Sequence, residues 1–227
     1  MGHHCRSGAG AGFRRGWIED GGVPRAREAK HREENEIEFS RIVAFSDGVF
    51  AIAITLLVLN LGVGEGVEDG ELGRVLWNHH QDLFAYALSF AVIGRFWLVH
   101  HRFFGEVTGF DSRLIWLNLF YLAWIVLIPF SSSVLGDHGG QVAVVLYAAN
   151  LSGVVLTGMW MAADARGAGL TSIDAGTHRE QRYRSLYIAA VFLASIPVAF
   201  VAPGVAPFMW LALFFDPAAR FAAAPEG

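Results

Sequence analysis

Cysteine is nearly absent from this sequence, and charged residues are scarce. The single cysteine, Cys5, cannot form an intrachain disulfide and cannot build a metal cluster alone. Only 17% of the 227 residues are charged, whereas soluble domains usually carry about a quarter. Hydrophobic residues make up 54% of the chain, and the mean hydropathy is positive at +0.41. These features exclude a disulfide-stapled secreted domain and indicate an integral membrane protein.

The two ends of the chain are expected to lie outside the membrane. Residues 1–40 lack the apolar stretch of a secretory signal, and they mix glycine, histidine and both signs of charge. We therefore expect residues 1–40 to form a cytoplasmic tail, disordered or locally helical, and residues 217–227 to form a short C-terminal tail. The net charge of -4 is too small to indicate nucleic acid or another charged partner.

The apolar stretches predict the number of membrane crossings. A hydrocarbon core about 30 Å thick requires about 20 apolar residues per helix. Five stretches meet or nearly meet that length: Ile42–Val63, Leu83–Val99, Leu114–Leu135, Val142–Ala163 and Leu186–Val201. A sixth, Val205–Phe215, is short and has prolines around its start, so it could tilt or be re-entrant. The fold class is therefore all-α, with six transmembrane helices over residues 41–216.

The distribution of arginine and lysine predicts the orientation. The N-terminal tail and the second and fourth loops are basic, whereas the first loop, GEGVEDGELGR, is acidic and the third, GDHGGQ, carries neither lysine nor arginine. Basic loops stay on the cytoplasmic side of a membrane. The alternation fits six spans with the N-terminus inside, in a multi-pass protein of the cell membrane.

The first apolar segment, RIVAFSDGVFAIAITLLVLNL, carries polar residues within its first turns. A charge in a bilayer is costly and usually functional. At about 100° per residue, Ile52, Thr55 and Leu59 fall in one sector of about 60°, and Asp47 lies about 140° from Ile52. The pattern alone allows two interpretations of the three residues. They line a pore, or they face lipid or a neighbouring helix while Thr55 bonds to the carbonyl four residues earlier.

A motif in this segment resembles a known family of channels. The run R-x-x-x-F-S-D, formed by Arg41, Phe45, Ser46 and Asp47, is similar to the signature of the transmembrane protein 175 family of potassium channels. The stretches SFAVIGRFWLVHHRFF and RLIWLNLFYLAWIVLIPFSSSVLG extend the similarity, which covers residues 41–215.

The resemblance implies a homotetramer of six-helix subunits whose first helices line a central pore for potassium ions. In that family an aliphatic residue five positions after the motif aspartate forms the narrowest ring, which corresponds to Ile52. A hydroxyl residue one turn later is associated with potassium preference, and it corresponds to Thr55. A second aliphatic constriction corresponds to Leu59. These are the residues that the helical periodicity places in one sector.

The chain contains no T-V-G-Y-G stretch, so it lacks the carbonyl-ring filter of ordinary potassium channels. We expect a ring of Ile52 side chains to form a hydrophobic gate that closes by dewetting. We expect Thr55 hydroxyls to favour potassium over sodium, which makes the channel potassium-selective or a weakly selective cation channel.

The charged residues of the first helix need partners elsewhere. Arg41 and Asp47 are too far apart around a helix to pair with each other. The candidates are His100, His101 and Arg95, at the cytoplasmic end of the second helix. The resemblance implies a polar network between the motif and a histidine, whereas the alternative is that the charges snorkel to water. The predicted bracing set is Arg41, Phe45, Ser46, Asp47, Trp97, His100 and His101.

Two other functions compete with a channel. A secondary transporter, the alternative, needs an ionisable substrate site near the midplane, and this chain concentrates its ionisable residues at the cytoplasmic ends of its helices. An enzyme needs a catalytic set at a shared depth, and no such set is evident. Adjacent histidines on a helix diverge by about 100° and rarely hold one metal or haem. We expect no metal and no cofactor, and as partners potassium ions, further copies of the chain and membrane lipid.

Overall fold

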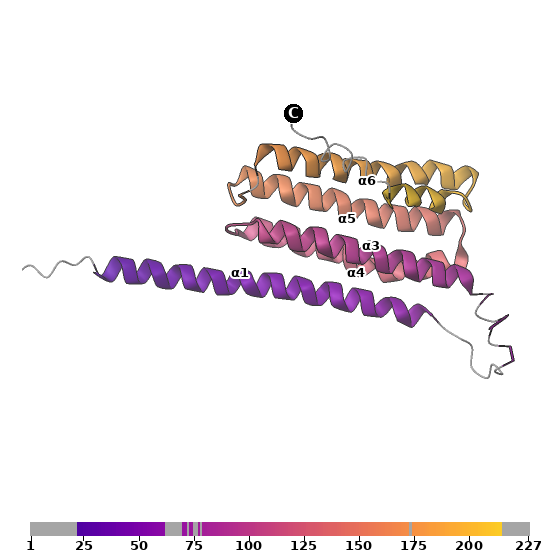
Figure 1. Ribbon diagram of the computed structural model, residues 1–227, viewed down its shortest axis with the longest axis horizontal. Helices are drawn as coiled ribbons and strands as arrows, with labels where there is room; N and C mark the ends of the chain where they lie inside the picture. The colour runs from indigo at the N-terminus through magenta and orange to yellow at the C-terminus, as the bar shows by residue number, and fades with distance from the viewer. Residues whose placement is uncertain are drawn as a thin grey trace, which may run out of the picture. The chain divides into compact units, whose positions relative to one another are not determined.

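The computed structural model describes residues 22–61, 70–71, 73–74, 77, 79–172 and 174–214. The chain divides into two units, residues 1–38 and residues 39–227, and the second unit holds a bundle of long helices (Figure 1). The predicted C-terminal tail and the first 21 residues of the predicted N-terminal tail lie outside the described residues.

The first helix, α1, spans Gly22–Leu56 and continues as a 3-10 helix, η1, over Leu57–Asn60. It begins well before the predicted start of the first span, so residues 22–40 are helical. The local sequence explains the difference. The stretch AREAKHREENEIE is rich in alanine, glutamate, lysine and arginine, which are strong helix formers.

Four more long helices follow: α3 (His80–Gly105), α4 (Ser112–His138), α5 (Gln141–Gly167) and α6 (Ala175–Val201). Each extends beyond the apolar stretch that predicted it, because helical structure continues through the polar flanks. At two of these starts an aspartate caps the helix: Asp111 accepts from the Leu114 N–H at 2.7 Å, and Asp174 accepts from the N–H groups of Gly176 and Thr177. The Thr177 hydroxyl also donates to Asp174, and together these bonds lower the pKa of that carboxyl.

Five of the described helices are long and apolar enough to cross a membrane. They are Glu36–Leu59, His80–Gly105, Ser112–His138, Gln141–Gly167 and Gly176–Val201. Each contains most or all of one of the first five predicted spans. The chain is therefore a multi-pass, all-helical membrane protein.

The predicted sixth span is a nine-residue 3-10 helix, η2, over Ala206–Phe214. At a rise of about 2 Å per residue it is about 18 Å long, which is less than the hydrocarbon thickness. It folds back along α6. The Trp210 indole donates to Ser195 Oγ at 3.0 Å, and the Tyr187 hydroxyl donates to the Ala212 carbonyl at 3.0 Å. Within the described residues, the last segment is thus a short helix packed into the bundle.

The long helices pack in a chain of neighbours, with α3 on α4, α4 on α5, and α5 on α6 (Figure 1). Buried hydroxyl groups connect α3, α4 and α5. Ser89 on α3 donates to Ser132 on α4 at 2.8 Å and lies 2.9 Å from the Tyr147 hydroxyl on α5. Each such bond between membrane helices contributes about 0.6 kcal/mol on average.

Two loops meet at one end of the bundle. The loop between α3 and α4 contacts the loop between α5 and α6, where the Thr108 N–H donates to the Leu170 carbonyl at 2.9 Å and the Ser172 N–H donates to the Glu106 carbonyl at 3.1 Å. These bonds place the end of α3, the start of α4, the end of α5 and the start of α6 at the same end of the bundle.

Candidate ion pathway and its bracing network

The second half of α1, together with the first residue of η1, has a buried face. Ser46, Phe50, Ala53 and Leu57 are all at most 1% exposed, and they are separated by four, three and four residues. This spacing keeps side chains on one side of a helix. The three apolar residues join the main hydrophobic core of the bundle. This face therefore fixes which side of α1 turns toward its own subunit.

The three residues predicted to line a pore lie on the other side of α1. The side chain of Ile52 is 60% exposed, that of Leu59 is 75% exposed, and Thr55 is exposed as well. An aliphatic side chain exposed in a membrane protein faces lipid, another copy of the chain or a pore. The fold leaves all three residues available for contacts outside the subunit.

The helical geometry around Leu59 differs from the straight α-helix on which the prediction was based. Because α1 ends at Leu56, Leu59 lies in η1, where successive residues turn by about 120° rather than about 100°. Over three residues the difference is about 60°. Leu59 is therefore rotated relative to Ile52 and Thr55 but remains on the exposed surface.

Thr55 uses its hydroxyl proton within the helix. Its Oγ1 donates to the Ile52 carbonyl at 2.8 Å, three residues earlier rather than four. A threonine hydroxyl has one proton and two lone pairs. Because the proton bonds to the backbone, only acceptor lone pairs remain for a group beyond this face. A cation is bound by such lone pairs, so the Thr55 oxygen is suited to contact one.

On the buried side, a chain of hydrogen bonds connects three helices. Ser46 on α1 donates to the Ile42 carbonyl at 3.0 Å and accepts from Asn118 Nδ2 on α4 at 2.9 Å. Asn118 Oδ1 lies 2.8 Å from His100 Nε2 on α3. Because Asn118 donates through its amide nitrogen, its oxygen must accept, so Nε2 of His100 carries a proton. The histidine therefore contacts the motif serine through Asn118.

Asn118 was not identified in the sequence as a site residue. The signal was present, because it is an amide inside a stretch of apolar and aromatic residues, and such residues in a membrane segment are usually functional. Periodicity could not reveal its partners, since the two residues that it joins are 72 and 18 positions away.

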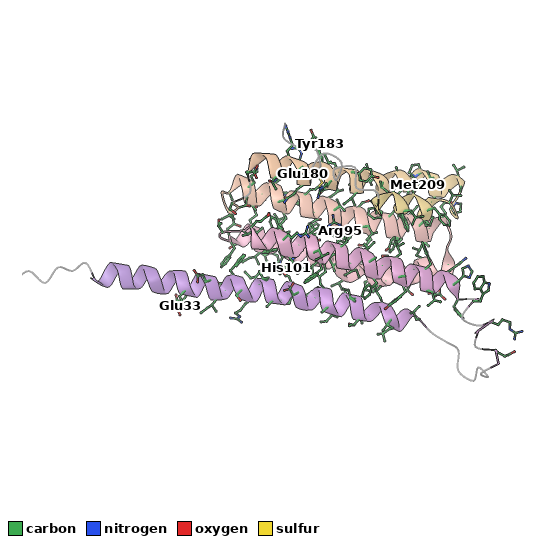
Figure 2. All side chains as sticks on the ribbon, viewed as in Figure 1. Glu33, Arg95, His101, Glu180, Tyr183 and Met209 are labelled. Atoms are coloured by element: carbon green, nitrogen blue, oxygen red, sulfur yellow. The ribbon has the colours of Figure 1, made fainter. Side chains whose placement is uncertain are left out.

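Asp47 makes a separate contact. Its Oδ1 accepts a hydrogen bond from the Trp97 indole on α3 at 2.9 Å. The Trp97 ring stacks on His101, with ring centroids 5.4 Å apart and planes 29° from parallel. Trp97, predicted to pack beside Asp47, is thus its hydrogen-bond donor. The two adjacent histidines belong to different contacts, since His100 is buried and His101 is exposed on α3 (Figure 2).

The arginines do not join these contacts. Arg41 and Arg95 are both exposed, and neither makes a hydrogen bond or ion pair with another residue in the part of the chain that the structure describes. Phe45 is 56% exposed and lies on the outer surface of α1. Within one subunit, the predicted bracing set therefore separates into a Ser46 and His100 arm, an Asp47 and Trp97 arm on which His101 stacks, and two outward-facing motif residues.

Metal binding has no support in the described residues. Within residues 22–214, apart from the undescribed positions, no group of three or more histidine, cysteine, aspartate or glutamate side chains could hold a metal ion. His79 Nδ1 lies 2.7 Å from Asp82 Oδ2, and His80 Nδ1 lies 2.8 Å from the Trp77 carbonyl oxygen. Both histidines of this pair therefore have local partners.

These observations define the class of protein. It is a multi-pass helical membrane protein whose first helix has an outward-facing surface of aliphatic and hydroxyl side chains. Other side chains of the same helix make polar contacts with α3 and α4.

Comparison with known proteins identifies the family. The model of the family described as the endosomal/lysosomal potassium channel TMEM175 matches residues 41–129. A protein of Streptomyces collinus described as a potassium channel is 33% identical over 172 residues, which cover 72% of this chain and 84% of that protein. A potassium channel of Chamaesiphon minutus is 34% identical over 175 residues, with 71% and 86% covered. The chain belongs to the TMEM175 family.

A solved structure supports the same assignment. The crystal structure of a lysosomal potassium-selective channel TMEM175 homolog from Chamaesiphon minutus superposes with a TM-score of 0.67 at 26% sequence identity. The match covers 82% of this chain and 99% of the other.

Proposed function

We propose that the protein is a potassium channel in which four copies of the chain assemble around a central pore lined by α1. The observation that carries this proposal is the division of α1 into two faces. One face is buried, and its Ser46 accepts a hydrogen bond from Asn118 of the same subunit. Ile52 and Thr55 are exposed on the other face. The description of two related proteins as potassium channels supports the proposed ion.

In this proposal Ile52 forms the gate. Four isoleucine side chains converging on an axis leave a narrow apolar passage, which excludes water when it is closed. A small tilt or rotation of α1 widens the passage and lets it fill. Leu59, about two turns later, provides a second apolar constriction.

Thr55 provides the selectivity. Its hydroxyl donates to the Ile52 carbonyl, so only its lone pairs are left to face the pore, where they contact a cation or accept a hydrogen bond from water. A cation passing the apolar ring loses part of its hydration shell, and potassium loses less than the more strongly hydrated sodium. Four hydroxyl oxygens, directly or through water, replace part of the hydration that the cation has lost. This mechanism uses no carbonyl-ring filter.

The two polar arms keep α1 in its rotational register. Ser46 and Asp47 are consecutive, so their side chains leave the helix about 100° apart. Ser46 is held by Asn118 on α4, and Asp47 is held by Trp97 on α3. Two anchors in different directions oppose rotation of the helix, and such rotation would turn Ile52 and Thr55 away from the axis.

The orientation follows from the charges. The end at which the two loops meet carries the arginines of the second and fourth loops, and we place it and the N-terminus in the cytoplasm of a cell-membrane protein. In that arrangement η2 re-enters the membrane along α6 from the opposite side, and at about 18 Å it spans part of the hydrocarbon.

A flux assay on the purified protein tests the proposal. Reconstituted in liposomes with a potassium gradient, the wild-type protein should pass potassium down its gradient without a counter-substrate. The Ile52→Asn variant should raise the resting flux several-fold by wetting the constriction. The matched control is Leu156→Asn, since Leu156 is also an exposed aliphatic residue of a membrane helix but lies on α5, away from the proposed pore. Flux that saturates and requires a coupled solute would indicate the transporter alternative. Equal flux from Ile52→Asn and the wild type would remove Ile52 from the gate.

A further inference from the structure

The outer surface of α6 combines a basic end with an apolar stripe. At about 100° per residue, Arg179, Arg182, Tyr183 and Leu186 lie within a sector of about 100° on the helix. Tyr183 is 62% exposed and points away from the bundle (Figure 2). The same sector continues through two further exposed apolar residues, Leu193 and Phe200. One face of α6 is thus positively charged over its first turns and apolar beyond them.

The two arginines on this face have no protein partner. Arg179 and Arg182 are exposed, and neither forms a hydrogen bond or ion pair with any residue that the structure describes.

Other arginines at the same end of the bundle are engaged. Arg184 pairs with Glu180 at 2.8 Å, Arg113 pairs with Asp164 at 2.8 Å, and Arg166 donates to the Asp174 carbonyl at 3.5 Å. The positive charge of Arg179 and Arg182 is therefore available to an external anion.

The position of α6 indicates which environment it faces. α1 contacts α3 and α4 through Trp97, Asn118 and Tyr121, whereas α6 packs on α5 and η2. If α1 faces a shared axis, α6 lies at the periphery of the assembly, against lipid. Its basic turns then lie at the level of the headgroups, and its apolar stripe lies beside acyl chains.

We propose that this face of α6 binds an anionic phospholipid of the cytoplasmic leaflet. Arg179 and Arg182 contact the phosphate and the charged headgroup, Tyr183 lies at the interface between headgroup and hydrocarbon, and Leu186 and Leu193 lie along an acyl chain. Tyrosine is enriched at this level of the bilayer, and basic clusters beside a membrane helix recognise anionic lipids. The proposal rests on the proposed function for the orientation of α6 and for its place at the periphery.

Native mass spectrometry of the full-length protein in detergent tests this directly. The protein is titrated with dioleoyl-phosphatidylglycerol and, separately, with dioleoyl-phosphatidylcholine, which share their acyl chains. Phosphatidylglycerol should bind more tightly. Each arginine beside an anionic surface accounts for about a fivefold change in affinity, so Arg179→Gln and Arg182→Gln should each weaken phosphatidylglycerol binding about fivefold and together about 25-fold. Binding of phosphatidylcholine should not change.

Arg102→Gln is the matched control, because Arg102 is an exposed arginine at the same end of the bundle but on α3. It should alter phosphatidylglycerol binding less than about twofold. The proposal is overturned if the double variant binds phosphatidylglycerol like the wild type, if Arg102→Gln has the same effect, or if the wild type does not discriminate between the two lipids. Displacement by an equal concentration of inorganic phosphate would also overturn it, since that indicates a site for soluble anions.

Potassium flux measured on the same samples separates the two proposals. A wild-type protein that binds phosphatidylglycerol through α6 but passes no potassium contradicts the proposed function alone. A protein that conducts without lipid preference contradicts only the lipid site.

Discussion

Asn118 donates a hydrogen bond to the hydroxyl of Ser46 at 2.9 Å, although the two residues lie 72 positions apart in the chain. Asn118 is 1% exposed and Ser46 is fully buried. A single amide thereby connects α4 to the proposed pore helix, and through its oxygen it also holds His100 on α3. Three helices are fixed relative to one another by one side chain.

Replacing Asn118 with alanine should therefore affect both stability and conduction. The change leaves the buried His100 Nε2–H and the Ser46 oxygen without their partner, and an unsatisfied buried polar group costs about 1–3 kcal/mol. We expect Asn118→Ala to lower the melting temperature of the purified protein and to reduce potassium flux, because α1 loses its link to α4. Both quantities can be measured on one preparation, by thermal unfolding in detergent and by flux in liposomes.

The control for this prediction is Asn150→Ala. Asn150 is also buried, at 4% exposed, and donates to Ser131 at 3.0 Å, but this bond joins α5 to α4 and does not involve α1. It should lower the melting temperature to a similar degree and leave the flux per folded protein unchanged. An equal loss of flux in both variants would show that general destabilisation, rather than the link to α1, is responsible.

The second anchor of α1 gives a prediction about non-additivity. Asp47→Ala removes the acceptor, and Trp97→Phe removes the donor but keeps an aromatic ring, so each breaks the same 2.9 Å bond. Each variant should reduce potassium flux, and the double variant should lose little more than either one, because residues that act through one contact are coupled. Asp47→Asn keeps a carbonyl oxygen for the indole and should retain most of the flux. Normal assembly and flux in Asp47→Ala would contradict a bracing role.

The sequence predicted the long helices well and the short one poorly. A run of about 20 apolar residues identifies a membrane helix because the bilayer imposes that length, and five such predictions correspond to five helices. The segment Val205–Phe215 offered too few residues for this criterion. Whether so short an apolar run crosses alone or folds back depends on a partner surface, which Ser195 and Tyr187 supply here. Those contacts are between distant positions of the chain and leave no periodic pattern.

For the site, periodicity could identify the surface but not the contacts. The spacing of Ile52 and Thr55 is enough to place them on one side of α1, and both are exposed. The separate partners of the adjacent residues Ser46 and Asp47 depend on where α3 and α4 pack around the helix. The sequence does not reveal the role of Asn118 for the same reason. An amide in an apolar stretch indicates that a polar partner exists, but it does not indicate which residue that partner is.

Thr55 provides a test of selectivity. Thr55→Ala removes the four hydroxyl oxygens that the proposal places in the pore, so the ratio of potassium to sodium permeability should fall toward one. Thr55→Ser keeps the hydroxyl and its bond to the Ile52 carbonyl and should preserve most of the ratio. Reversal potentials under bi-ionic conditions measure the ratio independently of the number of channels. An unchanged ratio in Thr55→Ala would remove this residue from the filter.

The contact between α4 and α5 makes a prediction about stability alone. A Cβ atom added to Gly153 on α5 would lie 2.7 Å from two carbon atoms of the Trp124 indole on α4, closer than real contacts allow. A rigid ring cannot yield as the end of a flexible chain does, so the helices must separate, and overpacking of this kind costs about 1–3 kcal/mol. Gly153→Ala should therefore lower the melting temperature of the purified protein. Gly94→Ala is the matched control, since nothing lies within 4 Å of its added Cβ and alanine favours a helix, so its melting temperature should be equal to or above that of the wild type. If the two variants melted alike, the close approach of α5 to Trp124 would not be a constraint on the fold.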